Sequence, residues 1–175
     1  MYKRMFLWVE GLDDERFFNS IIKPLLEKKY EYVETRAYST LKTVKIISFL
    51  KSMKSMKADY IFVTDIDRSP CITVKKQSLI EKLGTVEKDK IAVVIKEIES
   101  WYLAGLDDTT SKKIKIHNFK TTDSVTKEQF NEVFHGKFDS KIYLLSKVLE
   151  MFSQDEAKKK NKSFAYFVDK HCGQA

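Results

Sequence analysis

The chain contains little cysteine and no long apolar run. Its 175 residues include only two cysteines, Cys71 and Cys172, without a Cys-x-x-Cys spacing. No secretory leader precedes the first apolar segment, so we expect a reducing, cytoplasmic setting. No apolar stretch approaches the roughly 18 residues that a membrane-spanning helix requires, which argues against a membrane-embedded protein.

Two further absences restrict the function. The histidines, His117, His135 and His171, lack the i, i+4 spacing of a zinc-binding helix and predict no zinc site. No Gly-x-x-x-x-Gly-Lys-Ser/Thr motif occurs, so an ATPase domain of that type is not expected. If the activity of this protein is driven by ATP hydrolysis, a separate ATPase partner protein would have to supply it.

The composition is that of a folded, basic protein. Its length and its 43% hydrophobic content fit one globular domain with a proper core. The formal net charge of +7 favours a polyanionic partner, because lysines and arginines that neutralise phosphates release counterions from nucleic acid. The alternative is that the many lysines reflect genome composition or solubility.

Strand-like and helix-like segments alternate along the first part of the chain. The expected strands are residues 4–10, 32–38, 58–65 and 90–96. Helical spacing of apolar residues appears over 13–26, 40–57 and 77–83. Thr40 could cap the second of these helices, and Pro24 should kink or end the first. The pattern predicts an α/β, Rossmann-like fold with a mainly parallel sheet of about four strands flanked by helices.

The remainder is predicted to be a helical C-terminal region, 106–175, of a single domain whose core is 1–105. Residues 97–105 fit either a continued strand or a helix that Gly105 ends. A polar loop is expected over 107–123, with a short extended piece at 114–119. Thr126 has capping-box spacing, and Asp139 or Ser140 could begin a further helix. Residues 158–162 are expected to form a charged connector before a last helix.

Carboxylates follow the ends of two predicted strands. Glu10 ends the first strand, and Asp65 and Asp67 end the third. Ligands of open α/β sheets bind beyond the carboxyl ends of the strands, so these groups can converge. If the third strand continues through Asp67, its period of two places both aspartates on one side. Oxygen ligands suit Mg²⁺ (or Mn²⁺), so a metal site is predicted here.

Glu97 and Glu99 follow the fourth predicted strand and extend the same pattern. Four or five converging carboxylates would repel one another unless a cation neutralised them. Alternatives remain for each motif by itself. An Asp-x-Asp pair is commonly a turn or a helix cap, and the two glutamates could face solvent or pair with lysines.

The motifs together resemble the TOPRIM domain. The resemblance lies in Val9-Glu10-Gly11 followed by Asp14-Glu15-Arg16-Phe17-Phe18, in Val63-Thr64-Asp65-Ile66-Asp67 and in the segment from Glu97 to Ala104. The chain is similar to short TOPRIM-like proteins related to the nuclease domain of the overcoming-lysogenisation-defect family. The likeness covers about the first 105 residues, and the part from Glu97 to Trp101 is its most selective element.

The resemblance implies a Mg²⁺-binding fold that acts on phosphodiesters. It assigns Glu10 as a metal ligand or general acid/base, and Asp65 and Asp67 as the metal-binding Asp-x-Asp. Glu97 and Glu99 would complete a second metal position, as two-metal hydrolysis requires. Lys96 is a candidate for stabilising charge in the transition state, although a solvated lysine is the simpler interpretation.

The leading hypothesis is a Mg²⁺-dependent nuclease or related phosphodiester-processing enzyme, serving in phage defence or DNA repair. DNA is favoured over RNA. The residues expected to contact the nucleic-acid backbone are Arg68, Lys75, Lys76, Lys112, Lys113 and Lys115. A noncatalytic nucleic-acid or protein-binding module is the alternative. A haloacid-dehalogenase-type phosphatase ranks last. Asp65-Ile66-Asp67-Arg68-Ser69 resembles the nucleophile motif of that family. In the family, however, this motif normally lies on the first strand and is followed by Gly-Thr.

Overall fold

A computed structural model describes residues 2–136 and 140–173. The chain folds as two compact units, Met1–Val93 and Val94–Ala175, called unit 1 and unit 2 below. The sequence predicts a change from sheet core to helical region at residue 105. The observed division falls earlier, at the end of the fourth strand.

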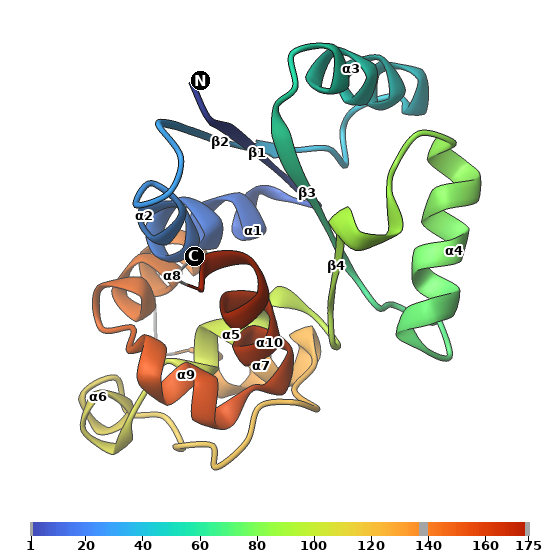
Figure 1. Ribbon diagram of the computed structural model, residues 1–175. Coiled ribbons are helices and arrows are strands. Elements are labelled where there is room, and N and C mark those ends of the chain that lie inside the picture. The colour runs from blue at the N-terminus through green and yellow to red at the C-terminus, as the bar shows by residue number, and fades with distance from the viewer. Residues whose placement is uncertain (1, 137–139, 174–175) are drawn as a thin grey trace. The chain divides into compact units, whose positions relative to one another are not determined.

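Unit 1 alternates strands with helices (Figure 1). Its elements are β1 (Arg4–Val9), α1 (Leu12–Phe17), the π-helical turn η1 (Phe18–Ile22), α2 (Lys23–Leu26), β2 (Tyr32–Ala37), α3 (Thr43–Ser55), β3 (Asp59–Asp65), α4 (Ile72–Leu83), the 3₁₀ turn η2 (Lys88–Lys90) and β4 (Ile91–Val94). The strands form one parallel sheet in the order β2-β1-β3-β4. The predicted Rossmann-like α/β class is confirmed.

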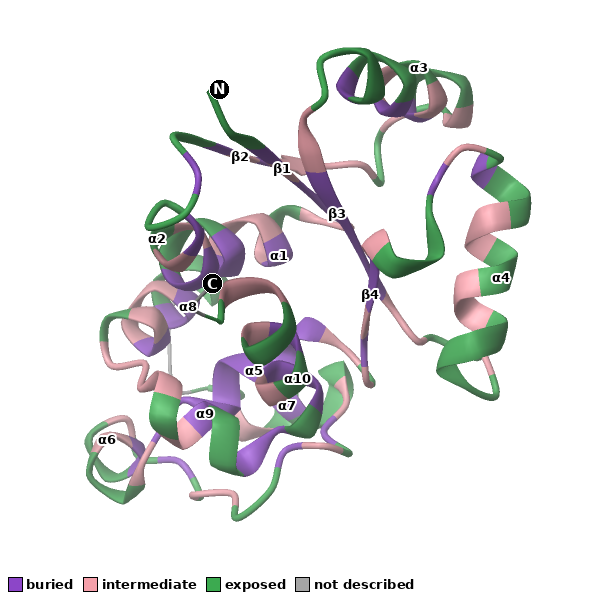
Figure 2. Cartoon of the chain, viewed as in Figure 1, coloured by how far each residue is buried: buried purple, intermediate pink, exposed green. Residues whose placement is uncertain are grey.

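Strand β1 is central and pairs with both β2 and β3. Arg4 lies opposite Tyr32 in one pairing, and Met5 lies opposite Asp59 in the other. The interiors of β1 and β3 are buried, as expected for strands covered on both faces (Figure 2). One face carries a cluster that joins β1 and β3 to α3, α4 and the segment after α4; its buried members are Trp8, Ile46, Leu50, Met53, Tyr60, Phe62, Leu83, Val86 and Ile91.

Pro24 interrupts the first helix as predicted. Proline has no amide proton, so the helix cannot continue its regular hydrogen bonding through this position. The Lys23 amide, directly before it, donates to the Phe18 carbonyl five residues back, which is the π-helical spacing of η1. Regular helix resumes in α2, with Pro24 in its first turn. The break in the regular helical hydrogen bonding is therefore accommodated by one π-helical turn.

Two helix boundaries in unit 1 differ from the prediction. Thr40 does not cap α3, because the Leu41 amide donates to the Tyr38 carbonyl (2.9 Å) and places Thr40 in a turn. Lys42 occupies the N-cap position instead, and Val44 is 79% exposed although the apolar spacing over 40–57 predicts an inward position for it. Helix α4 begins five residues earlier than expected, so Lys75 and Lys76 are helical.

Unit 2 is helical after its first residues, which confirms the predicted character of this region. Its elements are α5 (Ile98–Ala104), α6 (Asp108–Lys113), α7 (Lys127–Phe134), α8 (Lys141–Glu150), α9 (Gln154–Lys160), α10 (Lys162–Phe167) and the π-helical turn η3 (Val168–Cys172). The part of the chain that the structure describes contains no helix long and apolar enough to cross a membrane.

Helix α5 is the buried centre of unit 2. Trp101 is 1% exposed; its ring packs edge-on against Phe164, and its indole N–H donates to the Ser163 hydroxyl at 2.8 Å. Gly105 ends α5 as predicted. A Cβ at Gly105 would lie 2.2 Å from the Phe152 ring, so only glycine allows this close approach.

Several predictions in unit 2 need correction. The expected loop at 107–123 contains α6, and residues 114–119 follow this helix without regular secondary structure. The expected connector at 158–162 is helical except at Asn161, which ends α9 and caps α10. Thr126 forms the predicted capping box. Ser140 caps α8, while Asp139, the other candidate, lies outside the described residues.

An ion pair joins the amino ends of the strands in unit 1. Asp59, the first residue of β3, accepts hydrogen bonds from Lys90 (3.1 Å) and from the Tyr30 hydroxyl (2.9 Å). Burial raises the pKa of Asp59, but the hydrogen bonds from Lys90 and Tyr30 outweigh it, and the pKa lies below the ordinary value. Because the side chain is about half exposed, its contribution to stability is screened by water.

We expect Asp59→Asn to lower stability at neutral pH and to have less effect in acid. A carboxylate with a lowered folded-state pKa stabilises the fold above its unfolded pKa, about 3.9, and loses that contribution as pH falls through the folded value. Urea unfolding at pH 7, 5 and 3 measures this. The control is Glu81→Gln, an exposed carboxylate that accepts from the neutral amide of Gln77. A constant difference between Asp59→Asn and wild type at all three pH values would contradict the assignment.

Candidate active site

Glu10 and Asp65 lie at the carboxyl ends of neighbouring strands of unit 1. Glu10 directly follows β1, and Asp65 is the last residue of β3. The strands are parallel and paired from Met5↔Asp59 to Trp8↔Phe62. The predicted convergence of these two strand ends at one edge of the sheet is therefore present.

A pocket of about 540 Å³ opens at this edge. Four of the residues predicted from sequence line it: Glu10, Asp67, Arg68 and Lys75. They come from the end of β1, from the turn after β3 and from the first half of α4. Thr64, the penultimate residue of β3, also lines the pocket.

Asp67 reaches the pocket from a turn and not from a strand. Strand β3 ends at Asp65, so the expected period-of-two relation between Asp65 and Asp67 does not apply. Asp67 has φ of 49°, in the left-handed region that few residues other than glycine adopt. The Asp67 carboxylate forms an ion pair with the Lys75 ammonium of α4. The turn thereby directs Asp67 toward α4.

Negative charge surrounds Tyr38 beside the same strand ends. Tyr38 follows β2, and its hydroxyl donates to the Val63 carbonyl of β3 at 3.1 Å. Burial raises the pKa of Tyr38, and the charges of Glu10, Asp14 and Asp65 raise it further. These carboxylates are therefore close enough to act on one hydroxyl. Asp14 was not expected here; its Oδ2 accepts from the Gly11 amide (3.2 Å), as its position in the first turn of α1 could have indicated.

One face of α4 forms a basic wall of the pocket. Lys75, Ser78, Leu79 and Lys82 follow helical spacing and all line it. Sequence reasoning missed Lys82. The spacing of Lys75 and Lys82 over two helical turns would have identified it, but the predicted helix began at residue 77 and left Lys75 outside. Both carboxylates and lysines therefore line the pocket.

The oxygen donors of this pocket suit a hard cation. Mg²⁺ usually takes one or two protein carboxylates and keeps several waters, and Glu10 and Asp67 supply that number. Within residues 2–136 and 140–173, no three Asp, Glu, His or Cys side chains gather as a metal-binding group. Lys75 already pairs with Oδ2 of Asp67, so a metal at this carboxylate would compete with the Lys75 ammonium or bind the other oxygen, Oδ1.

The other basic candidates are more dispersed. Arg68 is exposed at the pocket, whereas the Lys76 ammonium donates to the Lys88 carbonyl at 3.2 Å. Lys112 and Lys113 are exposed in the last turn of α6 in unit 2. Lys96 is exposed, with φ of 65° in the bend before α5. Lys160, in the charged segment 158–162, is buried and donates to Asn118 (2.7 Å), which leaves it unsuited to bind phosphate.

Glu97 and Glu99 belong to unit 2, where lysines are their neighbours. Helix α5 begins at Ile98, which decides between the two alternatives left open by the sequence. The Glu97 carboxylate accepts a hydrogen bond from the Lys127 amide. Glu99 is buried, and its carboxylate lies 3.3 Å from the Lys141 ammonium and 3.9 Å from that of Lys127. Within this unit the charge of Glu99 is balanced by ammonium groups.

No family model, curated protein or solved structure matches this chain. The TOPRIM resemblance and the roles that it implies for Glu10, Asp65, Asp67, Glu97 and Glu99 therefore remain predictions. What is shown independently is the α/β fold with its parallel sheet.

We expect Glu99→Gln to destabilise the protein even in the presence of EDTA. The substitution removes a buried charge that faces two ammonium groups, and hydrogen bonds to charged groups contribute about 1.5–3 kcal/mol. Urea unfolding in EDTA measures the loss. Glu132→Gln, an exposed carboxylate on α7, serves as the control and should change stability by no more than about 0.5 kcal/mol. Equal stability of the two variants would exclude a structural role for Glu99.

Proposed function

We propose that the protein is a Mg²⁺- or Mn²⁺-dependent enzyme that processes phosphodiester bonds of nucleic acid, with DNA favoured over RNA. The observation that carries this proposal is the pocket of unit 1 that brings Glu10 and Asp67 together with Arg68 and Lys75. The carboxylates offer ligands for one hard cation, and the basic residues offer partners for phosphate. The net charge of +7 agrees with a polyanionic substrate.

Each group has a distinct part in the proposed chemistry. Glu10 and Asp67 would hold the metal, which lowers the pKa of a bound water and offsets charge on the phosphate. Asp65 would add negative charge beside them, close to Tyr38. Arg68, Lys75 and Lys82 would orient the substrate backbone along α4. The TOPRIM resemblance supports this assignment and extends it to Glu97 and Glu99 as ligands of a second metal, with a separate ATPase as a partner in phage defence or repair.

Metal-dependent cleavage of labelled single-stranded DNA, duplex DNA and RNA tests the proposal. We expect Glu10→Gln and Asp67→Asn each to lower the cleavage rate about 100-fold or more, because metal ligation and activation of water depend on them. Glu81→Gln, a conservative change on α4 outside the pocket, should retain full activity. Thermal unfolding confirms that the variants fold. Absence of cleavage with every metal, or full activity of both site variants, would refute a catalytic role.

One observation favours a noncatalytic nucleic-acid-binding module as the second candidate. The ion pair between Asp67 and Lys75 balances the Asp67 charge without a metal. Such a module would bind nucleic acid with strong salt dependence, and binding would be indifferent to EDTA and to Asp67→Asn. Fluorescence anisotropy across a salt series, with and without EDTA, distinguishes the two functions.

A further inference from the structure

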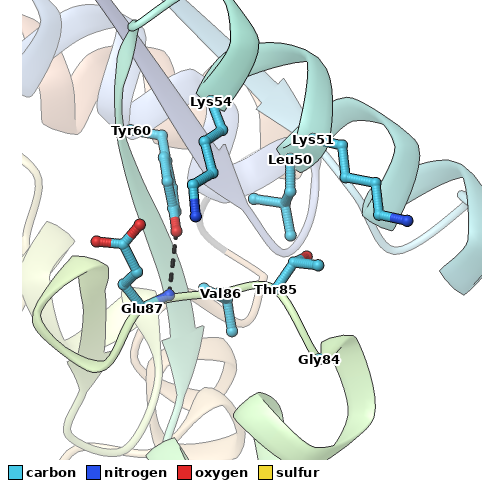
Figure 3. Close-up of a pocket in the computed structure, with 8 residues that line it drawn as sticks. All are labelled: Leu50, Lys51, Lys54, Tyr60, Gly84, Thr85, Val86 and Glu87. Atoms are coloured by element: carbon cyan, nitrogen blue, oxygen red, sulfur yellow. Dashed lines mark hydrogen bonds between the residues drawn. The ribbon is translucent and has the colours of Figure 1, made fainter.

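A second pocket lies near the amino end of β3 and is distinct from the pocket of Glu10 and Asp67. Its volume is about 430 Å³, within the roughly 300–1,000 Å³ typical of small-molecule sites. It is lined by Leu50, Lys51 and Lys54 of α3, Tyr60 of β3, and the segment 84–87 that follows α4. All of these belong to unit 1. Figure 3 shows Lys51 and Lys54 on either side of Leu50.

Tyr60 supplies a buried polar group to this pocket. The residue is 6% exposed, and its hydroxyl oxygen accepts from the Glu87 amide at 3.1 Å (Figure 3). Among the described residues, the structure gives the Tyr60 O–H no acceptor for its own proton. A buried hydroxyl normally donates as well as accepts, so the pocket offers an unused donor at its inner wall.

The two lysines supply positive charge at the same pocket. No carboxylate forms an ion pair with Lys51 or Lys54 in the described parts of the chain, although other lysines of unit 1, such as Lys75 and Lys90, are paired. Glu87 also contributes to the lining, and its charge offsets one ammonium. Two ammonium groups and one carboxylate leave a net positive charge at the pocket, which favours an anion.

Apolar surface lies between these polar groups. Leu50 and Val86 are 2% and 5% exposed, and both line the pocket, with the Tyr60 ring beside them. A flat apolar group in the pocket would contact the small exposed edges of these side chains. Gly84 turns the chain at the end of α4 with φ of 66°, which carries Thr85 and Val86 back toward α3. Polar donors and an apolar wall thus meet in one small site.

We propose that this pocket binds a small organic phosphate, in which a phosphate group is joined to a flat apolar ring. A phosphate carries about 1.5–2 negative charges and three acceptor oxygens. Lys54 and the Tyr60 hydroxyl provide donors for these oxygens, Lys51 adds positive charge on the far side of Leu50, and the ring packs on Leu50 and Val86. This ligand site is separate from the proposed active site, since the two pockets share no lining residue.

Nuclear magnetic resonance titration of the ¹⁵N-labelled chain tests the proposal with four probes: AMP, phenyl phosphate, adenosine and inorganic phosphate. We expect AMP or phenyl phosphate to shift the amide signals of Gly84, Thr85, Val86 and Glu87. Adenosine and inorganic phosphate should bind at least about tenfold more weakly, because each lacks one half of the recognised group. Failure of both organic phosphates to shift these amides, or equal binding of either fragment, would overturn the proposal.

Substitutions locate the interaction. Lys54→Met and Tyr60→Phe should each weaken binding, Lys54→Met about tenfold or more because a charge-assisted bond is lost. Lys54 is exposed, so its replacement leaves the core intact. Glu87→Gln should strengthen binding by removing a repulsive charge. Lys45→Met, on α3 but outside the pocket, is the matched control and should leave affinity unchanged. Unchanged affinity in Lys54→Met, or shifts confined to Ser69 and Ser78 at the other pocket, would contradict the assignment.

Discussion

The parallel pairing of β1 with both β2 and β3 determines where chemistry can occur in unit 1. Parallel strands end at the same edge of a sheet, so Glu10 after β1 and Asp65 at the end of β3 become neighbours although they are distant in sequence. The same pairing brings Tyr38 after β2 close to them. A shift by one residue would move every side chain of a strand to the opposite face of the sheet, where its packing partners differ. The hydrophobic interior thus fixes the positions of the carboxylates.

The electrostatics of this edge depend on α4 as much as on the strands. Carboxylates grouped around Tyr38 destabilise one another when buried, and opposite charge nearby reduces that cost. Asp67 is not among the carboxylates that act on Tyr38, but it receives opposite charge from Lys75, because α4 begins at Ile72, shortly after the turn. A divalent cation would offer the same carboxylate a larger charge. In the proposed function, this cation would weaken the attraction between Asp67 and Lys75.

The hydrophobic pattern was sufficient to predict the sheet. Strands that are buried on both faces have continuous apolar runs, such as Ile91 to Val94. The same pattern did not predict where helices begin. Thr40 and Lys42 differ in capping propensity in favour of Thr40, yet a local turn at Tyr38–Leu41 decides the boundary. Glu10 and Asp67 were predictable from strand ends. Lys82 was missed because the predicted helix began too late to include Lys75. Tyr60 was not predictable, because its role depends on the contact with the segment that follows α4.

Helix α4 connects the two pockets of unit 1. Its face from Lys75 to Lys82 lines the pocket with the carboxylates, and the segment Gly84–Glu87 that ends it lines the pocket with Tyr60. A ligand can shift an equilibrium only if it binds two positions of that segment with different affinity. The hydrogen bond from the Glu87 amide to Tyr60 holds the segment on β3, so a phosphate at Tyr60 would act on this attachment directly. Any resulting coupling would be reciprocal: metal at Asp67 would alter phosphate affinity by the same factor as phosphate alters metal affinity.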